Sequence, residues 1–449
     1  MAGPTEHNRL SDVDALLWRI ETDPLLRSTV MMVSVLDRLP DIERFTERSR
    51  QAVELIPRLR QRVVSGTIGA PRWEDDPYFD LSYHIRVLNA PGNRTLRDVL
   101  DMAVPIAMAG FDRARPLWES YLIDGMADGS AAMIQKVHHS VTDGVGGMEL
   151  VLASYDLERD PAEQFDPAAL RAAAEPAAAG AQRGLLARSV ITTAKSLRKP
   201  RAAYARTSEV MASFKRGLQA TPDPLSPLMV GRSMSSRYDT LSIPLAELKG
   251  AAKRQHATLN EAFVSALMGG LRAYHAAHGV DVDELRMTLP VNARDTGIAD
   301  ASGNNQFVPT RFTVPLTLAD PVARMLVVRE RLAEQLAEPS LEFAAPMATV
   351  MNRLPTPAIT KLFGGMFKGV DFIASNVPGP PVYLFTAGAR VEAQFPFGPL
   401  AAAAVNFTLL SGPESVAIGI NTDPAAVPDP EVLLDCVKQG FDEILKLAG

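Results

Sequence analysis

Two stretches of alternating strand-like and helix-like pattern, separated by a segment of different composition, limit most strongly what this chain can fold into. The separating segment, residues 161–235, is rich in alanine. Between residues 183 and 216 it carries nine Lys or Arg but a single acid, Glu209. Alanine favours helix, whereas several later prolines interrupt it. We therefore predict an α/β protein whose two subdomains, residues 1–160 and 236–449, are joined by a partly helical crossover.

Apolar spacing predicts the elements of the first stretch. Residues 13–20 and 42–56 have the periodicity of amphipathic helices, and Pro57 is expected to end the second of them. The remaining expected elements are strands at residues 28–36, 84–87 and 131–137 and a helix at residues 148–155.

The second stretch contains local signals for a helix start and for a hairpin. Thr258 and Glu261 have the spacing of a capping box, which predicts a helix over residues 258–278. Residues 411–414, Ser-Gly-Pro-Glu, predict a turn between two strands. The other expected elements are strands at 238–245, 285–289, 307–316, 370–374, 401–410 and 415–420 and a helix at 431–447.

Composition and charge exclude several classes of protein. With 47% hydrophobic and 22% charged residues the chain is globular rather than disordered. The net charge of −6 gives no general basic field for nucleic acid. The one cysteine, Cys436, has no partner for an internal disulfide, and no Cys/His cluster indicates zinc. The N-terminus lacks the pattern of a secretory signal and no apolar run is long enough to span a bilayer, so we expect a cytoplasmic protein.

Residues 137–147, VHHSVTDGVGG, carry the strongest indication of chemistry. They lie between an expected strand and an expected helix, where side chains are presented from a rigid scaffold. Neighbouring strand residues point to opposite faces, so one of His138 and His139 faces a given cleft, which argues against a shared metal ion. Such a histidine is suited to act as a general base at neutral pH. Asp143 could brace the turn and the glycines allow a close approach by substrate. Taken alone, the two histidines are equally well explained as structural residues at a strand end.

The full HHxxxDG string, His138 to Gly144, is the signature of an acyltransferase superfamily that includes chloramphenicol acetyltransferase-like enzymes and peptide-synthetase condensation domains. Further motifs make nearly the whole chain, residues 10–447, resemble the bacterial wax ester synthase/diacylglycerol acyltransferase family. These motifs are LSDVD at 10–14, PRLRQR at 57–62, RPLWE at 115–119, LNEA at 259–262, PVNAR at 290–294 and SNVPGP at 375–380.

This resemblance implies two chloramphenicol-acetyltransferase-like subdomains with mixed sheets and an active-site tunnel between them. It implies that a long-chain fatty acyl group moves from acyl-CoA to diacylglycerol or a fatty alcohol, giving triacylglycerol or wax ester. His139 would be the base that deprotonates the acceptor hydroxyl, and no acyl-enzyme is required. His138 and Asp143 would orient the loop, and Gly144 would give it its backbone shape.

The same resemblance nominates supporting residues in both halves. Transfer needs hydrogen-bond donors aimed at the developing oxyanion. The candidate donors are Asn260, Asn292, Ser375 and Asn376, although Asn260 could simply begin a helix and Ser375–Asn376 could simply set a turn. Arg294 could pair with Asp143 across the two halves. Pro116, Leu117 and Trp118 fit packing beneath the site or along the acyl path better than chemistry.

One position departs from the family pattern, and other functions compete with the implied one. The chain has Asn260–Glu261 where the family usually has Asn-Asp, which puts the level of activity and acceptor choice in doubt. One alternative is a condensation-type enzyme that uses a carrier-protein thioester, and another is a non-catalytic lipid-binding protein. A hydrolase is disfavoured because no Gly-x-Ser-x-Gly motif is present.

The expected partners are amphiphiles rather than macromolecules. Acyl-CoA would be a co-substrate, and no metal or prosthetic group is expected, since a base and oxyanion donors suffice. We expect peripheral association with the inner membrane or lipid droplets. The basic segment at 183–216 is either a solvated helix face or a docking surface for anionic headgroups.

Overall fold

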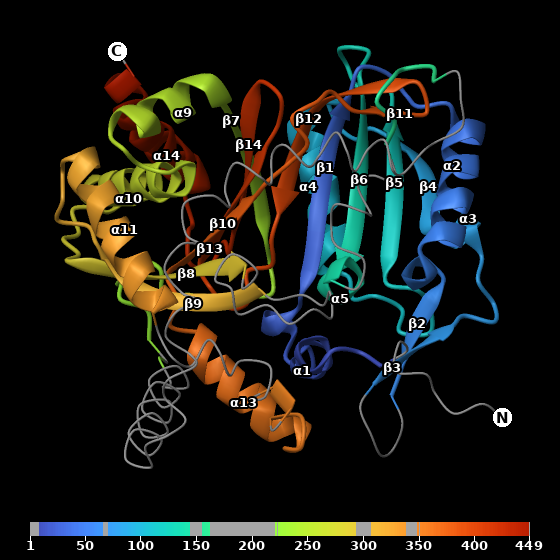
Figure 1. Cartoon of the computed structure of the whole chain (residues 1–449), viewed down its shortest axis with the longest axis horizontal. Coiled ribbons are helices and arrows are strands. Elements are labelled where there is room, and N and C mark those ends of the chain that lie inside the picture. The colour runs from blue at the N-terminus through green and yellow to red at the C-terminus, as the bar shows by residue number, and fades with distance from the viewer. Residues whose placement is uncertain are drawn as a thin grey trace, which may run out of the picture.

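The computed structural model describes residues 9–65, 71–143, 155–161, 221, 223–292, 307–337, 348–349 and 351–448. Two six-stranded sheets lie side by side, each with helices against it (Figure 1). The expected helix at 148–155 and most of the crossover at 161–235 lie outside the described residues.

The first sheet is mixed, with the strand order β11-β12-β1-β6-β5-β4. Only β4 and β5 are parallel neighbours; the other pairs are antiparallel. Alternate residues of β1, β5 and β6 pack Met31, Ile123 and Ile134 against helix α4, Leu96–Met108. The strands are β1 (Thr29–Leu36), β4 (Ile85–Asn89), β5 (Trp118–Asp124), β6 (Ala131–His138), β11 (Phe385–Thr386) and β12 (Ala389–Phe397).

Other helices of the first half follow the capping and breaking signals of the sequence. Helix α1, Asp12–Ile20, begins at Ser11, whose side chain accepts from the amide of Asp14. Helix α2, Ile42–Leu55, ends before Pro57 as predicted. A two-stranded sheet of β2 (Gln61–Val64) and β3 (Arg72–Asp75) and the short helices α3 (Leu81–His84) and α5 (His139–Asp143) complete the described part of this half.

The second sheet is also mixed, with the order β7-β14-β13-β10-β8-β9. Strand β10 runs parallel to both β8 and β13. The predicted hairpin joins β13 to β14. The predicted strand at 401–410 begins only at Val405, because Ala401 and Ala402 adopt positive φ values that no strand contains. The strands are β7 (Arg237–Pro244), β8 (Glu284–Asn292), β9 (Phe307–Pro315), β10 (Phe372–Val377), β13 (Val405–Ser411) and β14 (Ser415–Thr422).

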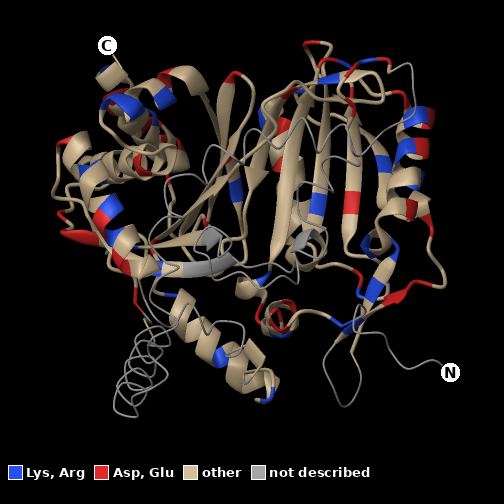
Figure 2. Ribbon diagram, in the orientation of Figure 1, with Lys and Arg blue, Asp and Glu red and all other residues tan. Residues whose placement is uncertain are grey.

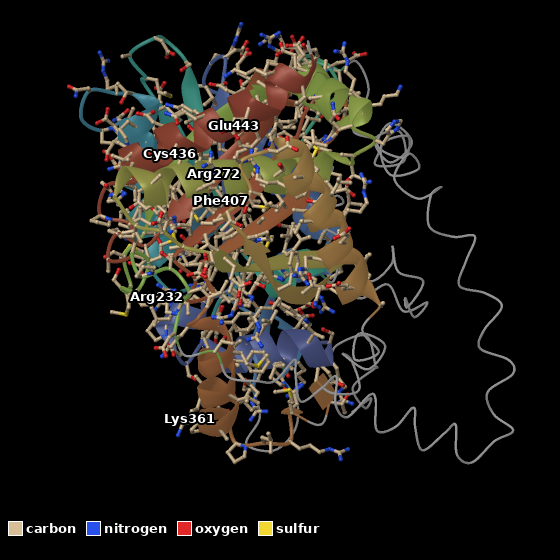
Figure 3. The ribbon with its side chains drawn as sticks, turned by 90° about the vertical axis from the view of Figure 1, so that its left-hand side faces the viewer. Arg232, Arg272, Lys361, Phe407, Cys436 and Glu443 are labelled. Carbon is tan, nitrogen blue, oxygen red and sulfur yellow. The ribbon has the colours of Figure 1, made fainter. Side chains whose placement is uncertain are left out.

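Helices α10 and α14 pack against each other in the core of the second half. Figure 3 shows Cys436 and Glu443 on α14 beside Arg272 on α10, with Phe407 of β13 beneath them. The helices approach closely because residue 440 is a glycine and has no side chain. A Cβ at this position would lie only 2.1 Å from the carbonyl oxygen of Ala266. The capping box of Thr258 and Glu261 starts α10 as predicted. The helices are α9 (Leu245–Arg254), α10 (Leu259–Ala277), α11 (Pro321–Leu336), α13 (Thr356–Phe367) and α14 (Pro430–Leu445).

The first sheet is not built from the first half of the sequence alone. Strands β11 and β12 come from the second half of the sequence, yet β12 pairs with β1 in the first sheet over residues 391–397. The division into residues 1–160, 161–235 and 236–449 stays a prediction, and this strand pair crosses it. As a result, β12 of the first sheet contacts β13 and β14 of the second.

Candidate active site

Both histidines of the HHxxxDG string lie where strand β6 ends and helix α5 begins. The main chain of this corner is fixed from two sides, because the amide of His138 donates to the carbonyl of Leu117 (3.0 Å) and that of His139 to the carbonyl of Ser28 (2.9 Å). The side chain of His138 is 1% exposed, whereas His139 is partly exposed. Of the two histidines, His139, the first residue of α5, is the one whose side chain is accessible from outside the fold.

The imidazole of His138 is held at both nitrogens. Its Nε2 lies 2.9 Å from a carboxylate oxygen of Glu21, and its Nδ1 lies 2.7 Å from the hydroxyl of Ser140. The rings of Trp18 and Phe111 meet it edge-on at centroid distances of 5.7 and 6.1 Å. His138 thus has the contacts of a residue that shapes the corner.

Glu21 is a site residue that the sequence motifs do not indicate. It follows the last residue of α1 and is separated from His138 by 117 positions. Burial by itself raises the pKa of its carboxyl, but hydrogen bonds from His138 and the Ser28 amide, together with the charge of Arg113, outweigh burial and lower that pKa. Glu21 is therefore a carboxylate at neutral pH.

Pro116, Leu117 and Trp118 are buried beside this corner. Trp118 is paired with Val137 across β5 and β6, its indole N–H donates to the carbonyl of Leu59 (2.8 Å), and its ring stacks on His84. These are packing contacts, and the role of the segment beneath the site or along the acyl path stays a prediction. Trp118 and Val137 also line a small pocket between α2 and the sheet, with Phe45, Arg48, Ser49, Ala52, Leu59, Glu119, Ser120 and Gln135.

The opposite face of the same strands carries a buried charged cluster. Lys136 on β6 is 1% exposed, and its ammonium donates to the carbonyl of Ala109 (2.9 Å) and lies 3.7 Å from Glu119 on β5. Figure 2 shows that strands β5 and β6 carry few charges. Glu119 also accepts from Tyr121 and Arg86. The cluster lies beneath α4 and fixes the strand that ends in the histidines.

Three candidate oxyanion donors belong to one edge of the second sheet. Strands β8 and β10 are parallel with Phe372 opposite Met287, so Ser375 and Asn376 lie at the same carboxyl edge as Asn292. Ser375 and Asn376 are partly exposed on β10.

Asn260 is placed elsewhere, in the first turn of α10. Its side-chain oxygen is buried without a hydrogen-bond partner. The carboxylate of the neighbouring Glu261 accepts a hydrogen bond from the main-chain amide of Thr258. Its Oε2 lies 2.7 Å from Nη2 of Arg329. Gly144 and Arg294 lie outside the described residues, as do the side chains of Asp143 and Asn292. The pairing of Asp143 with Arg294 therefore stays a prediction.

Comparison with family models covers most of the chain. Residues 10–263 match the wax ester synthase/diacylglycerol acyltransferase catalytic domain, and residues 303–445 match the C-terminal domain of the same family. A Mycobacterium tuberculosis protein named as a diacylglycerol O-acyltransferase is 38% identical over 100% of this chain and 95% of its own length. A second protein of that organism with the same activity in its name is 27% identical over 94% of this chain and 92% of its own length.

Solved structures show the same fold. The wax ester synthase/diacylglycerol acyltransferase from Marinobacter aquaeolei VT8 matches with a TM-score of 0.63 at 20% identity, over 98% of this chain and 100% of that one. The first condensation domain of the calcium-dependent antibiotic synthetase matches with a TM-score of 0.60 at 14% identity, over 98% and 96% of the two chains. The predicted fold class, two mixed α/β units of this type, is confirmed.

Proposed function

The chain belongs to the wax ester synthase/diacylglycerol acyltransferase family and is an acyltransferase, and we propose that it transfers a long-chain fatty acyl group from acyl-CoA to diacylglycerol or a fatty alcohol. The observation that carries the proposal is the pair of histidines, His138 and His139, at the end of strand β6. His139 is partly exposed on a corner fixed by main-chain hydrogen bonds, while His138 is fully engaged beside it.

His139 acts as the general base of the proposed reaction. It removes the proton of the acceptor hydroxyl as that oxygen attacks the thioester carbonyl carbon. The tetrahedral intermediate then collapses with cleavage of the carbon–sulfur bond, and the imidazolium returns its proton to the departing thiolate of CoA. The products are an ester and free CoA, so no acyl-enzyme forms and the base is regenerated.

Donors from the second half support the charge that develops on the thioester oxygen. Asn292, Ser375 and Asn376 suit this role because two parallel strands bring them to one sheet edge, and Asn260 is the fourth candidate. Each well-placed donor lowers the barrier by about 3–4 kcal/mol. Asp143, the last residue of α5, and Gly144 set the path of the chain that follows this helix. In this scheme acyl-CoA is a co-substrate and the protein needs no resident cofactor.

Both substrates are amphiphilic, which supports a peripheral association with the inner membrane or lipid droplets. Within the described residues, no helix is both long and apolar enough to cross a bilayer. The basic segment at 183–216 is the proposed contact with anionic headgroups. Replacement of Arg198, Lys199 and Arg201 by serine should weaken binding to anionic liposomes, and unchanged binding would refute this contact.

The test of the proposed function is CoA-thiol release from palmitoyl-CoA by the purified protein. Hexadecanol, dioleoylglycerol or no acceptor is supplied, and His139→Ala is assayed alongside. We expect acceptor-dependent release that is lost in the variant, with the ester identified by mass spectrometry. Release independent of acceptor would instead indicate thioester hydrolysis. Activity with an acyl-carrier protein but none with acyl-CoA would replace the proposed donor with a carrier-protein thioester.

A further inference from the structure

We infer that Glu21 is a positioning residue for the general base, acting on His139 through Ser28 and through His138. The inference rests on the proposed function, because it concerns the residue assigned there as the base. Glu21 touches neither reacting group in that scheme. Its carboxylate, at the end of α1, instead contacts the main chain of Ser28 and the ring of His138. Ser28 accepts the amide of His139, and His138 precedes His139 in the chain.

The first connection runs through one residue of main chain. The amide of Ser28 donates to Oε1 of Glu21 at 2.6 Å, and the carbonyl of the same residue accepts the amide of His139 at 2.9 Å. Ser28 is 6% exposed, so water does not readily replace either bond. Loss of the carboxylate would leave a buried amide unpaired, which costs about 1–3 kcal/mol unless the segment moves. Movement of Ser28 carries the main chain of His139 with it.

The second connection runs through the ring of His138. Its Nδ1 lies 3.2 Å from the main-chain amide nitrogen of Ser140, which can only donate a hydrogen. This nitrogen therefore carries no hydrogen, and the neutral ring has its hydrogen on Nε2, 2.9 Å from Oε1 of Glu21. The carboxylate accepts that hydrogen and so selects both the tautomer and the direction of the ring.

The hydrogen bonds from Ser28 and from His138 both end on Oε1 of Glu21. Substitutions at position 21 can therefore test the position of this acceptor oxygen separately from its negative charge. Glutamine at position 21 keeps an acceptor oxygen in the place of Oε1 but removes the negative charge. Aspartate keeps the charge but is one methylene shorter, so it cannot reach Ser28 and His138 from the same backbone position. Alanine removes both. If Glu21 acts by holding geometry, activity should follow the order glutamate, glutamine, aspartate, alanine.

The matched control is Asp156, a carboxylate of the same half that is also buried. It is 7% exposed and pairs with Arg48 at 2.9 Å and Arg44 at 3.4 Å, at the segment bridged to β11 rather than at the histidines. Asp156→Ala removes a buried ionic contact of similar kind. We expect it to lower the melting temperature while kcat stays within about twofold of wild type.

The experiment measures kcat and the KM for palmitoyl-CoA in wild type, E21A, E21D, E21Q, D156A and H139A. A misplacement of about 1 Å can cost about 10²-fold in rate, so we expect E21A to lose about 10²-fold in kcat with KM within twofold. E21Q should retain kcat within about fivefold. A kcat of E21A within twofold of wild type, or an E21Q variant as slow as E21A, would overturn the inference.

A spectroscopic measurement tests the contact without turnover. The seven histidines are labelled with ¹⁵N, and the resonances of His138 are assigned with a His138→Gln variant. We expect His138 to show hydrogen on Nε2 in wild type and E21Q and a mixture of tautomers in E21A. Hydrogen on Nδ1 in wild type would overturn the inference. If wild type releases no CoA, the proposed function fails, whereas this measurement still decides whether Glu21 sets the tautomer of His138.

Discussion

Gly419 lies where the two sheets touch, and its replacement tests whether that contact holds the halves together. A Cβ at this position would lie 1.8 Å from the carbonyl oxygen of Pro396 and 3.0 Å from the ring of Phe397. Pro396 and Phe397 belong to β12 of the first sheet, whereas Gly419 belongs to β14 of the second. A β-carbon is accommodated at about 3.4 Å, so the two backbones would have to separate by about 1.6 Å.

Strand β14 cannot provide this movement by itself. Gly419 is paired with Thr408 of β13 on one side and Thr240 of β7 on the other, so β14 is an interior strand. The shift must be taken by β12 and by the first sheet to which it is paired. We therefore expect Gly419→Ala to cost about 2–3 kcal/mol, in the upper part of the usual range of about 1–3 kcal/mol for overpacking. At about 2 °C per kcal/mol for large domains, the melting temperature should fall by about 4 °C or more.

The assay is thermal unfolding followed by circular dichroism, with acyl transfer measured at a temperature where both proteins are folded. Gly250→Ala is the matched control, because nothing lies within 4 Å of a Cβ there and alanine favours the surrounding helix α9. The control should leave the protein unchanged or stabilise it by up to about 1 kcal/mol. A melting temperature of Gly419→Ala within 1 °C of wild type would show that the contact is not close-packed, and would refute the reasoning.

Two further predictions concern ion pairs of the second half. Glu261→Ala removes both the side-chain partner of the Thr258 amide and the ion pair with Arg329, so it should lower the free energy of unfolding by about 2 kcal/mol, measured by thermal unfolding. The control is alanine at the exposed Glu330, which should change the free energy of unfolding by less than about 0.5 kcal/mol. Hydrogen bonds to the Tyr274 carbonyl and to Asp429 raise the pKa of His278, so its contribution to stability is complete below the usual pKa of 6.5 and is lost as the pH rises through the folded-state value. His278→Gln should therefore lower the melting temperature more at pH 5.5 than at pH 8.5, and an equal loss at both pH values would contradict this assignment.

Local signals in the sequence were sufficient for many individual elements. The capping box at Thr258 and Glu261 is formed by neighbouring residues, so it could be recognised without knowing the fold. The same holds for the hairpin between β13 and β14. Pairing over long range has no such signal. Nothing local in β12 indicates that this strand joins β1, more than 350 residues earlier in the chain, rather than its own half.

In the candidate site, too, the residues of a local motif could be predicted from the sequence, whereas a residue that acts through a long-range contact could not. His138 and His139 were identified because their chemistry lies in one short string at a strand end. Glu21 was missed because its meaning depends on a contact across 117 positions, and an acid after a helix ordinarily indicates no more than a surface residue. Helix α4 was also missed, since Pro105 within it conflicts with helical propensity.

At Asn260–Glu261, where the family usually has Asn-Asp, the carboxylate of Glu261 contacts two helices. Glu261 is 6% exposed, and its oxygens are used by the Thr258 amide and by Arg329 of α11, which also donates to the carbonyl of His256. The extra methylene of glutamate thus lets one carboxylate cap α10 and hold α11 at the same time. Both contacts belong to helix packing on the outer side of the second half, and Glu21, not Glu261, contacts the histidine corner. An E261D variant should therefore lose stability before it loses acyl transfer, which would separate this position from the HHxxxDG string that precedes it in the chain.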